Sequence, residues 1–264
     1  MPDFDPWTPN VARVYDYTLG GKDNFPADRE FAEQLFTIVP EVVDHVRVNR
    51  QFLARAVTWL AGQGVSQFID LGPGLPTKPN THETARAVRP DARVVYVDND
   101  PVVVVHLEAA TGGCDPELSV LNADTWKPSA IMAAPEVTGY LDLDAPVAVI
   151  MGFLLHYLPA PEAAAVVAEY ARLLPAGSYL VITIGRGDPG TRVEKFYTAY
   201  NADARRLYNH THADFASFFA DLEILPPGLG FAQEYEPGQP AIPPPSPNRV
   251  AECLVGIARV PPRP

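Results

Sequence analysis

A glycine-rich loop after an apolar run is the first stretch of the chain whose residue spacing suggests chemistry. Residues 67–83 read QFIDLGPGLPTKPNTHE. The apolar part is typical of a strand that ends at Asp70, and Gly72 and Gly74 follow in the loop, so these three residues are candidate cofactor contacts. Nucleotide-binding α/β domains begin in this way, because a tight glycine turn lets the backbone approach a ligand closely.

The same loop is poorly supplied with donors for a pyrophosphate. A dinucleotide fold uses G-x-G-x-x-G and rests the pyrophosphate on backbone N–H groups at the start of the next helix. Thr77 replaces the third glycine, and the three prolines of the loop each lack an N–H donor. The next helix also starts late, because Asn80 and Glu83 have the spacing of a capping box. A ligand here need not carry a phosphate, and S-adenosylmethionine meets that description.

Acidic residues follow the next two predicted strands. Asp98 ends the run VVYVD, with Asn99 after it, and its carboxylate can accept hydrogen bonds from both ribose hydroxyls. Asp124 and Thr125 lie in NADTW after the third run, where Asp124 is placed to bind the adenine amino group. Each acid alone also fits a helix cap. The first strand is followed by a glycine turn, and each of the next two by an acidic residue. This series at three consecutive strand ends favours a cofactor site.

The segment after the fourth predicted strand is expected to meet the acceptor. It runs from Gly152 to Tyr157 and reads GFLLHY, so Gly152 is a candidate cofactor contact and His156 a candidate general base. The alternative is that His156 is a packed, satisfied side chain. Methyl transfer from a sulfonium is an in-line displacement, so a base is needed only when the acceptor carries a proton.

No metal site is predicted. Arg86 stands four residues after His82, where a zincin would carry its second histidine, and the His210-x-His212 pair lacks a clear third ligand.

The N-terminal segment RVYDYTLGGKDNF, residues 13–25, is rich in polar and aromatic groups. One interpretation is a lid that closes over the cofactor and excludes water from the sulfonium. Its candidate contacts are Tyr17, Gly21, Lys22 and Asn24. The alternative is a capped helix that leads into a helical hairpin.

The elements that must position these residues alternate along the chain. Helices are expected from Asn10 to Leu19, from Pro26 to about Val39 and from Pro40 to Gly62. Strands are expected at 67–71, 93–98, 118–121, 146–151 and 178–184, with helical segments between them. This alternation predicts parallel strands with crossover helices.

The end of the chain is different. After helical segments at 192–206 and 213–220, residues 222–225 and 250–260 read as an antiparallel strand pair at the sheet edge. The proline-rich stretch 226–247 is expected to be a solvated connector between them.

Composition limits the class of protein. The chain has 264 residues, 47% of them hydrophobic, which is enough for the core of one domain, and its net charge of −12 works against a nucleic-acid partner. Cys114 and Cys253 are far apart and predict neither a disulfide framework nor a zinc site. With no signal peptide or membrane span apparent, we expect a cytoplasmic protein with a small-molecule partner.

The whole chain resembles an actinobacterial family of class I S-adenosylmethionine-dependent methyltransferases, first catalogued as a domain of unknown function. The motifs that carry the resemblance are VARVYDYTLGGKDNFPADRE, LGPGLPTKPNTHE, VVYVDNDPVVVVHLEA, LLHYLPAP and PAGSYLVI. The resemblance implies a Rossmann-like α/β fold: a mostly parallel seven-stranded sheet with an antiparallel C-terminal strand pair and an N-terminal helical cap. It also implies cofactor contacts at Gly72, Gly74, Asp98 and Asp124.

The sequence therefore predicts an S-adenosylmethionine-dependent methyltransferase that acts on a small-molecule acceptor. Residues 1–64 are expected to form the cap and residues 65–264 the cofactor-binding part of one domain. The alternatives are a non-catalytic S-adenosylmethionine-binding sensor and, less favoured by the loop, a nicotinamide-dependent oxidoreductase.

Overall fold

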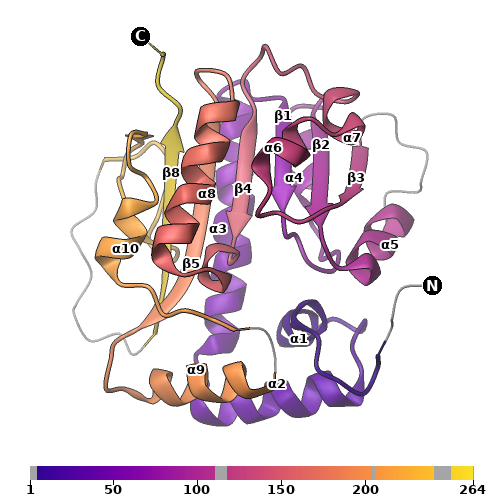
Figure 1. The fold of residues 1–264 in the computed structure, drawn as a ribbon, viewed down its shortest axis with the longest axis vertical. Coiled ribbons are helices and arrows are strands. Elements are labelled where there is room, and N and C mark those ends of the chain that lie inside the picture. The colour runs from indigo at the N-terminus through magenta and orange to yellow at the C-terminus, as the bar shows by residue number, and fades with distance from the viewer. Residues whose placement is uncertain (1–4, 111–117, 204–205, 241–250, 264) are drawn as a thin grey trace.

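The computed structural model describes residues 5–110, 118–203, 206–240 and 251–263, and it shows one mixed sheet with helices on both faces (Figure 1). Five parallel strands have the order β3-β2-β1-β4-β5. Their bounds are β1 Gln67–Leu71, β2 Arg93–Asp98, β3 Leu118–Asn122, β4 Ala148–Gly152 and β5 Tyr179–Gly187. The predicted parallel sheet is confirmed, because each of these strands pairs parallel with its neighbours in the sheet.

The C-terminal strands extend the sheet in the opposite direction. β8 (Ala251–Arg259) pairs antiparallel with β5, and β6 (Glu223–Ile224) pairs antiparallel with β8. The predicted antiparallel pair is thus confirmed. A two-residue strand, β7 (Gly230–Phe231), also pairs with β8, so the sheet has eight strands among the described residues rather than the expected seven.

β7 lies within the proline-rich stretch that was expected to be solvated. Ala232 and Tyr235 after it are buried, and the Tyr235 ring packs edge-on against Phe52 at 5.2 Å between centroids. Arg55 holds this stretch by donating to the carbonyl of Ala232 at 2.5 Å. The expectation of a solvated connector is therefore wrong for residues 230–235, whereas Pro226 and residues 238–240 are exposed as expected. Residues 241–250, the remainder of that stretch included, lie outside the described residues, as does Cys114.

Helices cover the two faces of the sheet, and the alternation of side chains along each strand decides which core each residue joins. Ile69, Val95 and Val149 face one core and Phe68, Val94 and Ala148 face the other. The first core is closed by α6 (Pro128–Met132), α7 (Pro135–Thr138), α8 (Ala160–Leu173) and α10 (His212–Ser217). The second is closed by α3 (Val42–Gly62), α4 (Thr81–Arg86) and α5 (Pro101–Ala110).

A third, smaller core lies beyond the carboxyl ends of the parallel strands. There α1 (Val11–Thr18) packs with α2 (Pro26–Ile38), and α9 (Arg192–Asp203) runs alongside α2 at the bottom of Figure 1. Its buried residues are Val14, Phe31, Ala32, Leu35, Tyr200 and Leu207. The predicted first helix begins where expected, since the Asn10 side chain accepts hydrogen bonds from the first-turn N–H groups.

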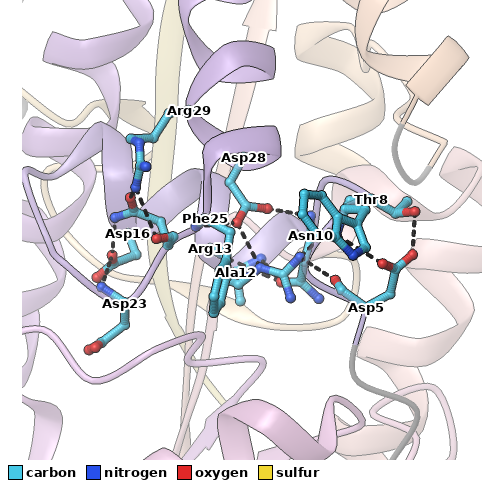
Figure 2. Close-up of polar contacts among 12 residues, drawn as sticks. Asp5, Thr8, Asn10, Ala12, Arg13, Asp16, Asp23, Phe25, Asp28 and Arg29 are labelled. Atoms are coloured by element: carbon cyan, nitrogen blue, oxygen red, sulfur yellow. Dashed lines mark hydrogen bonds and ion pairs between the residues drawn. The ribbon is translucent and has the colours of Figure 1, made fainter.

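Asp28 ties the start of α1 to the start of α2 (Figure 2). Its carboxylate, fully buried, accepts hydrogen bonds from the Asn10 and Phe25 N–H groups, each at 2.8 Å, and from Arg13 Nε, also at 2.8 Å. The Arg13 guanidinium further donates to the carbonyl oxygens of Asp5 and Thr8. The buried Arg13–Asp28 ion pair therefore holds the two helices together, and both of its charged groups have further hydrogen-bond partners.

Over the residues described, the structure contains no helix that is long and apolar enough to cross a membrane.

Candidate functional site

A cavity of about 380 Å³ lies at the carboxyl ends of β1, β2, β4 and β5. The N-terminal helices α1, α2 and α3 close it on the side away from the sheet, together with α9. Eight residues that the sequence singled out line it: Asp70, Gly72, Gly74, Asp98, Asn99, Thr125, Gly152 and His156. Parallel strands bring residues so distant in sequence to one edge, which is where ligands bind in open α/β sheets.

The loop after β1 needs its two glycines. Gly72 has φ +62° and Gly74 has φ +68°, in the left-handed region that side chains with a Cβ resist. A Cβ on Gly72 would also lie 2.8 Å from Leu154 Cδ1. The resulting turn directs the Gly74 N–H toward Asp98 Oδ2, at 3.4 Å.

Asp70 and Arg50 bring opposite charges to the cavity beside this loop. Asp70 is buried and accepts a hydrogen bond from Thr81 Oγ1 at 2.6 Å; burial raises the pKa of its carboxyl, while that hydrogen bond and Arg50 oppose the rise. The Arg50 guanidinium donates to the carbonyl of Thr77 at 2.8 Å. Arg50 is a lining residue that the sequence analysis missed, because α3 precedes every strand of the sheet.

Asp98, at the end of β2, is 7% exposed. Burial raises the pKa of its carboxyl to about 6, although the N–H groups of Asp100 and Gly74 stabilise the charged form. Asp100 in turn accepts a hydrogen bond from the Asn10 side chain at 2.6 Å. The first helix is thereby anchored to the strand end that carries Asp98.

A chain of hydrogen bonds links the residue after β4 to β5, α3 and α1. The Phe153 N–H donates to Thr183 Oγ1 at 2.9 Å, Thr183 donates to Asn49 Oδ1 at 2.7 Å, and Asn49 Nδ2 donates to the Tyr15 hydroxyl at 3.0 Å. Phe153 has φ +49°, a strained conformation for a residue with a side chain, and such strain concentrates at functional sites. Asn49 was missed in the sequence, although a polar residue on the apolar face of its helix was a usable signal.

His156 lines the cavity, 8% exposed, with its ring 4.7 Å from that of Tyr157. Burial, with a smaller contribution from nearby His210, lowers the pKa of its imidazole to about 3. The ring is therefore neutral near pH 7 and can accept a proton, but it is a weak base in this ligand-free arrangement. Its role as general base stays a prediction.

Four predicted contacts in the N-terminal segment lie outside the cavity lining: Tyr17, Gly21, Lys22 and Asn24. The Tyr17 hydroxyl donates to Glu33 at 2.7 Å, and the Asn24 amide donates to Asp16 at 2.8 Å. A Cβ on Gly21 would collide with the Asp16 side chain. Tyr17 thus links α1 to α2, and Gly21 and Asn24 lie against Asp16 in the turn between these helices. The contact of all four residues with a cofactor stays a prediction.

Asp124 lies next to Thr125, which lines the cavity, but is not itself part of the lining. Its carboxylate accepts a hydrogen bond from the Trp126 N–H at 3.1 Å and lies 3.7 Å from the Lys127 ammonium. Its contact with an adenine amino group stays a prediction.

No group of three or more potential metal-ligating side chains is found in the described ranges.

Residues 2–261 match the S-adenosyl methyltransferase family. The chain belongs to this family. The resemblance carried by the motifs is thus confirmed over nearly the whole length.

Two solved structures are similar over almost the full chain. A candidate methyltransferase from Thermobifida fusca YX is 38% identical, with a TM-score of 0.87 and coverage of 98% of each chain. A DUF574 family protein from Streptomyces avermitilis MA-4680 is 34% identical, with a TM-score of 0.84, and the match covers 96% of this chain and 98% of that one. No match was found among curated proteins.

A more distant structure shares the fold of this S-adenosyl methyltransferase family member. An O-methyltransferase family protein from Burkholderia thailandensis is 14% identical, with a TM-score of 0.52, and the match covers 86% of this chain and 63% of the other. The Rossmann-like methyltransferase fold that the motifs implied is confirmed.

Proposed function

We propose that this protein is an S-adenosylmethionine-dependent methyltransferase that acts on a small-molecule acceptor. The observation that carries the proposal is the position of Asp98, a buried carboxylate at the end of β2, beside the glycine turn that follows β1. A carboxylate in this place can accept hydrogen bonds from two ribose hydroxyls. The glycine turn lets the protein backbone approach the ligand closely.

The charges around the cavity fit a sulfonium cofactor better than a dinucleotide. The carboxylates on the lining outnumber the guanidinium groups: Asp70, Asp98, Asp100 and Glu252 against Arg50 and Arg186. A pyrophosphate would bring two negative charges toward these acids. A sulfonium brings a positive charge. Asp70 and Arg50, both on the lining, suit the ammonium and the carboxylate at the methionine end.

In the proposed reaction the bound sulfonium supplies an already activated methyl group. The protein aligns the acceptor with it and excludes water. The strained end of β4 and the hydrogen-bond chain through Asn49 would hold the reacting groups in place, and α1 would close the cavity. His156 is proposed to take a proton only from an acceptor that carries one.

Calorimetry and a turnover assay test this function against its alternatives. The protein should bind S-adenosylmethionine and its demethylated product S-adenosylhomocysteine, and NAD should bind at least about tenfold more weakly. A non-catalytic sensor would bind the cofactor yet transfer no methyl group to any acceptor of a broad chemical panel. Tighter binding of NAD than of S-adenosylmethionine would instead support an oxidoreductase.

Cofactor affinity is expected to fall as the pH is lowered through about 6. The pKa of Asp98 is raised to about 6, so below that pH its carboxyl is protonated and must lose a proton before it can accept both ribose hydrogen bonds. Each further pH unit should lower the affinity by up to about tenfold. His156, with a pKa near 3, does not titrate in this range.

Calorimetry between pH 5 and 8 measures this slope. Because burial also raises the pKa of Asp70, which would act in the same direction, Asp98→Asn is the control that assigns the slope. A wild-type affinity that stays constant from pH 8 to 5 would contradict the placement of the ribose on Asp98.

We further propose that residues 1–64 act as a cap on the cofactor-binding part, residues 65–264, with α1 as its moving element. Asn10, Ala12 and Tyr15 of the α1 region line the cavity, so α1 has to move if a ligand enters from its side. Cofactor should increase protection from hydrogen exchange in residues 11–25. Helix α8, which packs on the sheet away from the cavity, is the internal control. Equal protection of residues 11–25 with and without cofactor would show that α1 is a fixed support.

A further inference from the structure

The part of the cavity beyond β4 and β5 is lined by aromatic rings. They come from α2, from the end of β4 and the short helix η1 (Leu155–Tyr157), and from α9. We call this part the aromatic chamber; its rings are Phe36, Phe153, Tyr157, Phe196, Tyr197 and Tyr200.

Five of the six rings keep part of their surface uncovered; only Tyr200 is buried. Phe196 and Tyr200 lie with ring centroids 6.0 Å apart and planes inclined by 31°, and Phe153 lies 5.7 Å from His156. Apolar ring surface left uncovered in a cavity favours a ligand that covers it, because burial removes that surface from water. Flat aromatic ligands also gain from offset or edge-on contact with such rings.

The charged groups that reach the chamber are paired with one another. The Arg186 guanidinium, 7% exposed, donates to Glu252 in a close ion pair and to Asp188 at 2.7 Å. Glu252 is itself buried and also lies 3.2 Å from His212 Nε2. An anionic ligand would have to compete with Glu252 for Arg186, and a cationic ligand would have to compete with Arg186 for Glu252.

We infer that the acceptor is a neutral aromatic small molecule that stacks in the aromatic chamber, and that the Arg186–Glu252 pair selects against charged acceptors. The inference rests on the proposed function, since it names the substrate class of the same site. It predicts a preference among probes that differ only in charge or in aromaticity.

Three probes test the inference with the protein saturated by S-adenosylhomocysteine: 2-naphthol, 2-naphthoate and the saturated alcohol 2-decalol. Calorimetry should show 2-naphthol binding at least about tenfold tighter than 2-naphthoate and about fivefold tighter than 2-decalol. Equal or tighter binding of 2-naphthoate overturns neutrality, and equal binding of 2-decalol overturns aromatic stacking. If none of the probes binds, the inference is wrong.

Two further titrations separate this inference from the proposed function. S-adenosylhomocysteine binding is measured first, in the absence of any probe, and its failure would count against the proposed function alone. The probes are then titrated into the cofactor-free protein, so that the chamber is tested whatever the cofactor result.

Two variants test which residues cause the preference for neutral and aromatic probes. Glu252→Gln removes the buried one of the two carboxylates that pair with Arg186, so the affinity for 2-naphthoate relative to 2-naphthol should rise about tenfold. Phe196→Ala should weaken 2-naphthol about fivefold and leave S-adenosylhomocysteine within about twofold. Trp7→Ala is the matched control, because that ring is 83% exposed and lies outside the cavity lining.

An unchanged ratio in a folded Glu252→Gln protein would overturn the selection by charge. Should that variant not fold, Phe196→Ala still decides whether the chamber holds the probe.

Discussion

Replacement of Asp98 by alanine is expected to weaken the binding of S-adenosylmethionine at least about tenfold. The side chain is proposed to accept hydrogen bonds from both ribose hydroxyls, and charge-assisted hydrogen bonds contribute about 1.5–3 kcal/mol each. The backbone around it should persist, since the glycine turn and β2 are held by backbone hydrogen bonds as well. Isothermal titration calorimetry on the wild type and the variant measures the loss.

Asp91→Ala is the matched control for this experiment. Asp91 lies shortly before β2, is exposed, pairs with Arg89 at 3.1 Å and is not part of the cavity lining. Its removal should leave the affinity within about twofold. An Asp98→Ala protein that is folded and binds the cofactor as tightly as the wild type would contradict the assignment of the ribose.

The isosteric variant Asp98→Asn adds a test of stability. Folding raises the pKa of the Asp98 carboxyl from 3.8 to about 6, so the folded state favours the protonated form. The stability that this shift contributes is fully present below pH 3.8 and is lost as the pH rises through about 6. Above pH 6, the buried charge therefore costs the ligand-free protein about 3 kcal/mol. Asp98→Asn should raise the melting temperature at pH 7.5, weaken the cofactor, and change little at pH 4.

Replacement of Asp28 by alanine is expected to cause a large loss of stability. The substitution removes the carboxylate that Arg13 binds in a fully buried position and also removes the acceptor of the Asn10 and Phe25 N–H groups. Breaking a buried ion pair from one side costs about 3–5 kcal/mol. Urea denaturation should show this decrease in the free energy of unfolding.

Asp23→Ala serves as the control, because Asp23 is an exposed acid in the same segment (Figure 2). Its replacement should change the free energy of unfolding by no more than about 0.5 kcal/mol. If Asp28→Ala and Asp23→Ala were equally stable, the network of Figure 2 would contribute nothing to the packing of α1.

Local patterns in the sequence determined most elements of this fold. The strands at 67–71 and 93–98 are found at their predicted bounds, since a buried parallel strand is a short apolar run that ends at turn residues. The capping box of Asn80 and Glu83 is present, because a cap depends on residues three apart in the chain. Asp70, Gly72, Gly74 and Asp98 converge for a similarly simple reason, as carboxyl ends of neighbouring parallel strands share one edge.

Only the tertiary structure decided which residues outside the strand ends reach the cavity. Arg50 and Asn49 come from α3 and Glu252 from the start of β8, so the packing of distant elements, and no local spacing, brings them to the site. Packing also kept Tyr17 off the cavity lining, because its hydroxyl binds Glu33 of the neighbouring helix. A helix presents several faces, and the face that meets a ligand depends on neighbours that the sequence pattern does not name.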